Sequence, residues 1–121
     1  MADRQDAGLS RARTVAAGAV VADRDGAAQL TLAATARELD ASVPAILKHV
    51  RNLDDLRAAI GDQFLGELTA QIVAAVIGRS GDEALDAAAD AYRRHAVGRP
   101  GGYLLGLGVT HLHDAHYRDA A

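Results

Sequence analysis

The stretch from Leu30 to Leu56 constrains the fold of this chain more than any other part of its sequence. It contains two short runs with apolar residues at helical spacing, separated by a break of three or four residues. Thr31 precedes the first run and Ser42 precedes the second. Both hydroxyls can accept an otherwise unpaired N–H group at the start of a helix. Two short helices joined by a turn of this length form a helix-turn-helix unit, which we expect here.

The two expected helices have different apolar faces. Leu32, Ala36 and Leu39 give the first helix one apolar face, and Asp40 breaks the period in a turn where a positive φ is tolerated by aspartate better than by most residues. Pro44 lies in the first turn of the second helix, where its missing N–H group costs little. The second helix, expected over Val43–His49, has an apolar stripe formed by Val43, Ile46, Leu47 and Val50.

The segment LTLAATARELDASVPAILKHVRNLDDL resembles the DNA-binding domain of TetR-family transcriptional regulators. The most diagnostic part is the register from Ser42 to Val50, which is similar to the family pattern of a serine followed by a (Lys/Arg)-His pair. A second similarity lies in YRRHAVGRPGGY, residues 92–103, which resembles the "YR…HPGxY" region of one subclass of C-terminal domains. The resemblance covers residues 9–107. It implies an all-α fold with a three-helix head, a long connecting helix and a short helical C-terminal part.

The resemblance also implies a function. It predicts a sequence-specific DNA-binding transcriptional regulator that acts as a repressor, binds palindromic double-stranded DNA as a homodimer and responds to a small-molecule effector. Leu47 stands where the family has a phosphate-binding Tyr, and Leu53 stands where it commonly has a Lys. Direct readout of bases is expected to be modest, because small side chains cannot make bidentate contacts. The residues expected to contact DNA are Thr31, Ser42, Val43, Ala45, Lys48, His49 and Arg51.

An alternative function follows from Leu47 and Leu53, the two apolar replacements at expected DNA-contacting positions. A short TetR-like protein that has lost DNA binding would act as a protein–protein interaction partner of a full-length regulator. The chain also stops before the helices that form the family's usual dimer. We therefore expect either a short or truncated member of the family or a core that is closed by a different assembly.

Apolar periodicity divides the chain into a head, residues 9–52, and a truncated helical region for regulation and dimerisation, residues 53–121. A long helix is expected from Leu53 to about Gly78, and a break at residues 79–81 precedes a further helix that begins at Asp82. The long helix carries a stripe that recurs every four residues, formed by Leu56, Ile60, Phe64, Leu68, Ile72 and Val76. The residues of the further helix that are expected to face inward are Leu85, Ala88, Ala89, Tyr92 and Ala96.

The alanine-rich helix after Asp82 offers little surface to cover the far half of that stripe. An uncovered apolar patch of such a size invites association. The sequence therefore predicts a symmetric homodimer built from the long helix and the Tyr103–Leu107 segment, with Ile72 in a buried seam.

Composition excludes several other classes of protein. The 121 residues include no cysteine, which excludes a disulfide framework and a thiolate metal site and fits a reducing cytoplasm. No apolar run reaches the length of a membrane span, and residues 1–8 lack the layout of a signal peptide. The net charge of −3 means that attraction to DNA must come from local arrangement, such as Arg11 and Arg13 near phosphates.

Sites for chemistry are sparse in this sequence. No nucleophile elbow or phosphate-cradling loop is present, so we expect neither an enzyme nor a cofactor. The HLHDAH run, residues 111–116, has imidazoles at a spacing that can bind zinc or nickel, but a metal-free surface cluster is the favoured interpretation. Tyr92, His95 and Tyr103 are candidates for the edge of a ligand pocket, although ordinary core and rim packing explains each of them as well.

Overall fold

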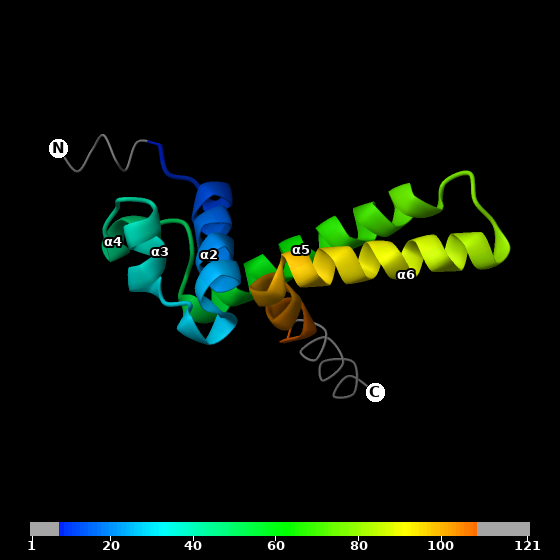
Figure 1. The fold of residues 1–121 in the computed structure, drawn as a ribbon. Helices are drawn as coiled ribbons and strands as arrows, with labels where there is room; N and C mark the ends of the chain where they lie inside the picture. The colour runs from blue at the N-terminus through cyan, green and yellow to red at the C-terminus, as the bar shows by residue number, and fades with distance from the viewer. Residues whose placement is uncertain (1–7, 109–121) are drawn as a thin grey trace, which may run out of the picture.

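The computed structural model describes residues 8–108, and within that range the fold is all-α, as the sequence predicts, with no strand. The head, residues 9–52, contains α2 (Arg11–Asp25), α3 (Leu32–Glu38) and α4 (Val43–Ile46), with the short 3-10 helix η1 (Ala27–Gln29) between α2 and α3. These helices pack side by side at one end of the molecule (Figure 1).

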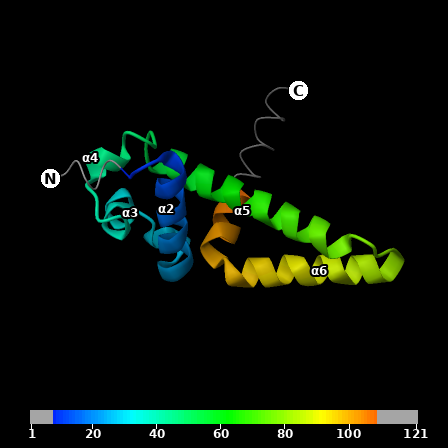
Figure 2. The ribbon, with the colours of Figure 1, turned by 90° about the horizontal axis from the view of Figure 1, so that it is seen from above.

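The rest of the described chain forms an arm that extends away from the head. α5 (Leu53–Val76) leaves the head, and α6 (Gly81–Gly98) returns along it in the opposite direction (Figures 1 and 2). Residues 100–108 are also helical, and we call them the return segment. The return segment lies at the junction of the head and the arm, beside the C-terminal end of α2 (Figure 1).

Four side chains cap the α-helices of the head and the start of α5, and two of them, Thr31 and Ser42, do so as the sequence predicts. The hydroxyls of Ser10, Thr31 and Ser42 accept the N–H groups of residues 13, 34 and 45 at 3.1, 3.0 and 3.2 Å. The side chain of Asn52 accepts the N–H group of Asp55 at 2.8 Å. Each of these bonds satisfies a donor that the helix itself leaves unpaired. The helix starts are therefore set by local sequence.

The head and the near half of α5 share one apolar core. Leu56, Ile60 and Phe64 from α5 are at most 1% exposed, and Leu56 and Ile60 pack with the buried face of α2. That face includes Val15, Ala19 and Ala22. The far half of the expected stripe, Leu68, Ile72 and Val76, is half-buried, because α6 packs along α5. The stripe of α5 is thus less open than the sequence suggested.

The orientation of α6 corrects a prediction. Leu85 is 69% exposed and Tyr92 is 41% exposed, although both were expected to face inward. The buried residues of α6 are instead Ala87 and Ala91. The distance between packed helices depends on the side chains at the contact, so an alanine face allows α6 to approach α5 closely. Leu85 and Tyr92 therefore remain on its outer surface.

Candidate nucleic-acid interface

The turn between α3 and α4 gives the head its helix-turn-helix geometry. Asp40 has φ 53°, the left-handed conformation expected at this position. Its N–H group donates to the carbonyl of Arg37 at 3.1 Å, and the N–H group of Ala41 donates to that of Ala36 at 2.9 Å. These two bonds form the Schellman motif that commonly ends a helix. An aspartate thus performs a role that glycine usually fills.

The second helix of the unit is shorter than the sequence predicts. α4 ends at Ile46 rather than His49. Beyond it the chain tightens, since Lys48 and His49 donate their N–H groups to carbonyls three residues earlier, at 3.4 and 2.9 Å. Bonds of this 3-10 type are common in the last turn of a helix. Lys48 and His49 therefore lie on a tightened turn after the helix, and Val50 follows as a buried residue.

The structure separates the seven expected DNA-contacting residues by exposure. The exposed ones are Thr31, Ser42, Lys48 and Arg51, whereas Val43 and His49 are half-buried. The side chain of Ala45 is 3% exposed, so it packs in the core and cannot meet a thymine methyl group. This corrects the prediction for Ala45, because the outward-facing positions of α4 are occupied by the residues next to it in the sequence. Leu47 is 42% exposed rather than part of the inner stripe.

Thr31 and Ser42 can serve the fold and a ligand together. Each hydroxyl oxygen accepts a backbone N–H group as a helix cap. A hydroxyl group also carries its own O–H donor, which a phosphate oxygen can accept. Both side chains are at exposed positions at the starts of the two helices of the unit.

Arg11 stabilises this unit and is not free to bind phosphate. Its guanidinium donates to both carboxylate oxygens of Asp55 at 2.9 and 3.0 Å and to the carbonyl oxygen of His49 at 3.1 Å. Asp55 also accepts the N–H group of Arg51 at 2.9 Å. The hydrogen bonds from Arg11 and Arg51 lower the pKa of Asp55 to about 2, so the carboxylate stays ionised at neutral pH. These bonds connect α2, the end of the helix-turn-helix unit and the start of α5.

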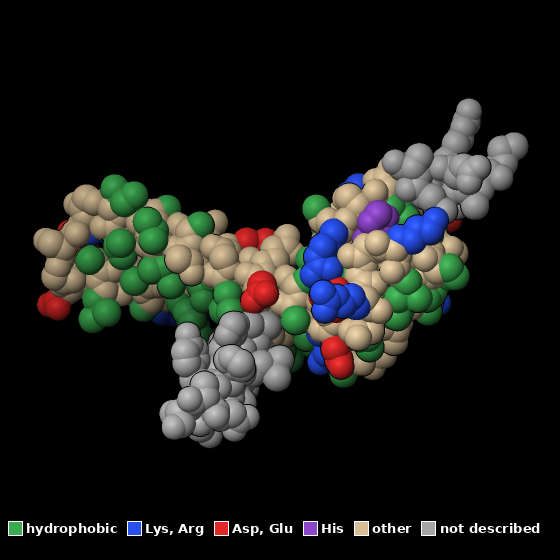
Figure 3. Space-filling model, turned by 180° about the vertical axis from the view of Figure 1, so that it is seen from behind, with side chains coloured by type: hydrophobic (Ala, Val, Ile, Leu, Met, Phe, Trp, Pro, Cys, Tyr) green, Lys and Arg blue, Asp and Glu red, His purple; other side chains and the backbone are tan. Residues whose placement is uncertain are grey.

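Basic side chains gather on the head rather than on the arm in one view of the surface (Figure 3). Hydrophobic side chains dominate the arm on the same face. Arg37, Lys48 and Arg51 are exposed in the head, whereas Arg13 donates to the carbonyl of Gly8. With a net charge of −3, attraction to a polyanion must arise from this local concentration of basic groups.

A junction that the sequence did not reveal holds the head against the arm. The guanidinium of Arg99, which follows α6, pairs with Asp23 of α2 and with Glu67 of α5. The second carboxylate oxygen of Asp23 accepts the N–H group of Gly102 at 2.9 Å. A Cβ atom at Gly101 would lie 2.2 Å from the carbonyl oxygen of Ala22, so glycine alone permits this approach. The only local signal was the Arg-Pro-Gly-Gly sequence, which by itself indicates no more than a helix end.

The three residues expected at a pocket edge are divided between the interior and the surface. His95 stacks on Phe64 with ring centroids 4.6 Å apart, and its side chain is mostly buried. The hydroxyl oxygens of Tyr92 and Tyr103 lie 3.3 Å apart, and both residues line an open groove. An effector site therefore stays a prediction.

A metal-binding cluster and a membrane-spanning helix are both absent from the part of the chain that the structure describes. No group of three or more His, Cys, Asp or Glu residues is arranged there to hold a metal ion. The HLHDAH run lies outside the described residues. Among residues 8–108, no helix combines the length and the apolar character that a membrane span requires.

Comparison with known proteins gives two similar sequences. The chain is 32% identical over 104 residues to YobS of Bacillus subtilis, covering 86% of this chain and 54% of that protein. It is 34% identical over 95 residues to Rv0681 of Mycobacterium tuberculosis, covering 78% of this chain and 44% of that protein. Both are named as uncharacterized HTH-type transcriptional regulators, which agrees with the helix-turn-helix geometry of α3 and α4. The chain spans about half the length of these curated relatives. No family model matches it.

Proposed function

We propose that this chain is a DNA-binding transcriptional regulator of the TetR type that represses by occupying its operator. The observation that carries the proposal is the α3–turn–α4 unit, with its Schellman turn and with exposed polar and basic side chains beside α4. The names of the two relatives support the same class. Because the chain spans only about half of each relative, the activity of a whole protein is part of the proposal.

The proposed mode of binding relies on phosphate contacts more than on base contacts. Lys48 and Arg51 supply positive charge, and the hydroxyls of Thr31 and Ser42 donate hydrogen bonds to phosphate oxygens of the DNA backbone. Val43 is the small apolar residue of α4 that remains partly accessible to a thymine methyl group. Binding by one such head would be weak. A homodimer that places two heads about 34–36 Å apart would read both halves of a palindrome.

Salt-dependent binding to the DNA upstream of its own gene tests this proposal. Lys48→Ala should weaken binding to all sequences and should lower the slope of log affinity against log salt by about one, because one phosphate contact is lost. Fluorescence anisotropy with labelled duplexes measures both quantities. Arg94→Ala is the matched control, since Arg94 is an exposed basic residue on the arm. The slope of log affinity against log salt should be the same for this variant as for the unmodified protein. Absence of salt-sensitive binding at low ionic strength would remove the main support for the proposal.

A second candidate function is favoured by Leu47, which is 42% exposed beside α4 where a polar group would suit DNA better. In this function the chain pairs with a full-length regulator and modulates it. Co-expression with a full-length relative followed by size-exclusion chromatography separates the two functions. Recovery of a mixed complex supports the second function, and recovery of self-association alone counts against it.

A further inference from the structure

The outward face of α4 and of the turn that follows it is mainly apolar. Ala45, Ile46 and Val50 are at most 3% exposed, so they belong to the core. Between residues 43 and 48, the positions that remain accessible are Val43, Pro44, Leu47 and Lys48. Lys48 is the one charged side chain of this set. The helix-turn-helix unit therefore presents an apolar patch, formed by Val43, Pro44 and Leu47.

Val43 and Leu47 are neighbours on this apolar patch. The N–H group of Leu47 donates to the carbonyl of Val43 at 3.0 Å, the bond that spans one helical turn. Side chains four positions apart on a helix lie next to each other. Leu47 is 42% exposed, and Val43 is half-buried. Two branched aliphatic side chains without a hydrogen-bonding group are therefore held together at the surface of the unit.

Basic side chains accompany the apolar patch. Lys48 directly follows Leu47, and Arg51 comes three residues later; both are exposed. The carboxylate of Asp55, which accepts the N–H group of Arg51, is already paired with Arg11. A ligand that complements this surface is an anion that also presents apolar groups. The major groove of DNA has this character, because phosphates border it and the C5-methyl group of thymine projects into it.

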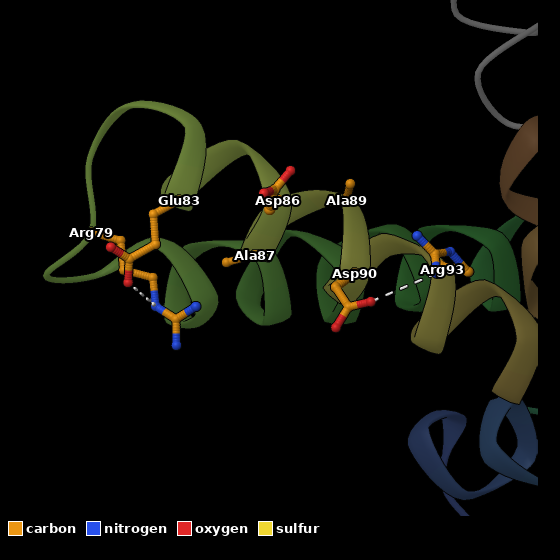
Figure 4. A pocket seen from close by; sticks show the side chains of 7 residues that line it. All are labelled: Arg79, Glu83, Asp86, Ala87, Ala89, Asp90 and Arg93. Carbon is orange, nitrogen blue, oxygen red and sulfur yellow. Dashed lines mark ion pairs between the residues drawn. The ribbon is translucent and has the colours of Figure 1, made fainter.

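A hollow on the arm has a different character. Its charged lining contains three carboxylates and two guanidinium groups, from Arg79, Glu83, Asp86, Asp90 and Arg93 (Figure 4). Ion pairs join Arg79 to Glu83 at 4.0 Å and Arg93 to Asp90 at 3.8 Å. A surface with an excess of carboxylates repels a polyanion. Attraction to DNA therefore favours the head, where the apolar patch lies beside exposed basic groups.

We propose that Leu47 and Val43 recognise thymine by its C5-methyl group, so that the sequence preference of the head depends on methyl groups in the major groove. This inference rests on the proposed function and adds the chemistry by which the operator is selected. Lys48 and Arg51 supply affinity through phosphates, which carry no sequence information directly. Leu47 is the main specificity-determining residue, because its side chain is the larger and the more exposed of the two.

An apolar side chain detects the methyl group alone. Leucine and valine have no group that distinguishes the O4 acceptor of thymine from the N4 donor of cytosine. The C5-methyl group of 5-methylcytosine occupies the same place in the major groove as the methyl group of thymine. The head should therefore accept 5-methylcytosine where it accepts thymine, and cytosine methylation should strengthen binding at such positions.

Replacing thymine by uracil removes the methyl group and leaves the hydrogen-bonding edge of the base unchanged. Labelled duplexes from the DNA upstream of the chain's own gene, synthesised with either base, are titrated with the full chain and followed by fluorescence anisotropy. Each contacted thymine that becomes uracil should weaken binding about fourfold, which corresponds to about 0.8 kcal/mol for one buried methyl group. With a C·G pair at the same position, 5-methylcytosine should bind more tightly than cytosine by the same factor.

Leu47→Ala identifies the side chain that detects the methyl group. This variant should lose most of the difference between thymine and uracil duplexes, whereas its slope of log affinity against log salt should not change. Val20→Ala is the matched control, because Val20 is also a large exposed aliphatic side chain of the head, 47% exposed on α2, and this variant should keep the full difference. Circular dichroism should show unchanged helix content for both variants, since both side chains are exposed.

The possible failures of the two proposals are distinguishable. Equal affinity for thymine and uracil duplexes, or a difference that Leu47→Ala leaves intact, would overturn the inference while DNA binding itself stands. Absence of salt-sensitive binding to every duplex would overturn the proposed function and the inference with it.

Discussion

The head and the arm of this molecule are stabilised in different ways. Large aliphatic side chains fill the core of the head, and each of its α-helices begins with a side-chain cap. The arm beyond Phe64 is held largely by alanine, its larger residues Leu85 and Val97 lie outside, and Ser80 before α6 makes no side-chain cap bond. The head therefore covers most of its apolar surface by its own packing, whereas the arm leaves an apolar surface exposed that suits a partner.

The largest effect should come from emptying the core that the head shares with α5. Ile60→Ala should lower the free energy of unfolding by about 2–5 kcal/mol, because Ile60 is 0% exposed and its removal leaves a cavity. Ile77→Ala at the end of α5, where the side chain is 73% exposed, should change it by less than about 0.5 kcal/mol. Urea denaturation measures both. Similar losses at the two sites would contradict the contrast between head and arm.

A smaller loss is expected where the return segment touches the head. Gly101→Ala should cost about 1–3 kcal/mol, because the added Cβ atom would overlap the backbone of Ala22 and force the segment away. Gly66→Ala provides a control of opposite sign. No atom lies within 4 Å of a Cβ built there, and alanine favours a helix by up to about 1 kcal/mol over glycine. A stabilising effect of Gly101→Ala in thermal unfolding would show that the junction is looser than described.

The smallest effect separates the caps of the two regions. Ser42→Ala should cost about 1 kcal/mol, because it removes the hydrogen bond to the N–H group of Ala45. Ser80→Ala should cost close to nothing, since the Ser80 side chain makes no cap bond at the start of α6. Chemical denaturation of the two variants under identical conditions makes the comparison. Equal losses of stability in the two variants would show that Ser80 caps α6 as effectively as Ser42 caps α4.

The features that the sequence predicted are those decided by neighbouring residues. Thr31, Ser42 and Asp40 determine a helix start or a turn within a few positions, and each performs the expected role. The orientation of α6 was predicted wrongly because periodicity reveals an apolar stripe without revealing what covers it. The alanine face of α6 packs against α5, and the apolar stripe that contains Leu85 lies on the outside of the helix.

The missed parts of the candidate site depend on contacts between distant residues. Arg11 pairs with Asp55, 44 positions away, and this pairing removes a base that was expected near phosphate. Arg99 pairs with Asp23, 76 positions away. No local pattern distinguishes these arginines from solvated ones. Ala45 illustrates the same limit at short range, because a shift of one position around α4 decides whether a methyl group is buried or exposed.

The contact of Gly101 and Gly102 with the end of α2 has a mechanical consequence. The head joins the arm covalently through the start of α5, and it joins it again, without a covalent bond, at Ala22 and Asp23. A body attached at one point can rotate about three axes, but a body attached at two points can rotate only about the line between them. The core that the head shares with the near half of α5 opposes rotation about that line as well. While all of these contacts hold, the head follows every movement of the near half of α5, and loss of the return-segment contact would remove one of the restraints.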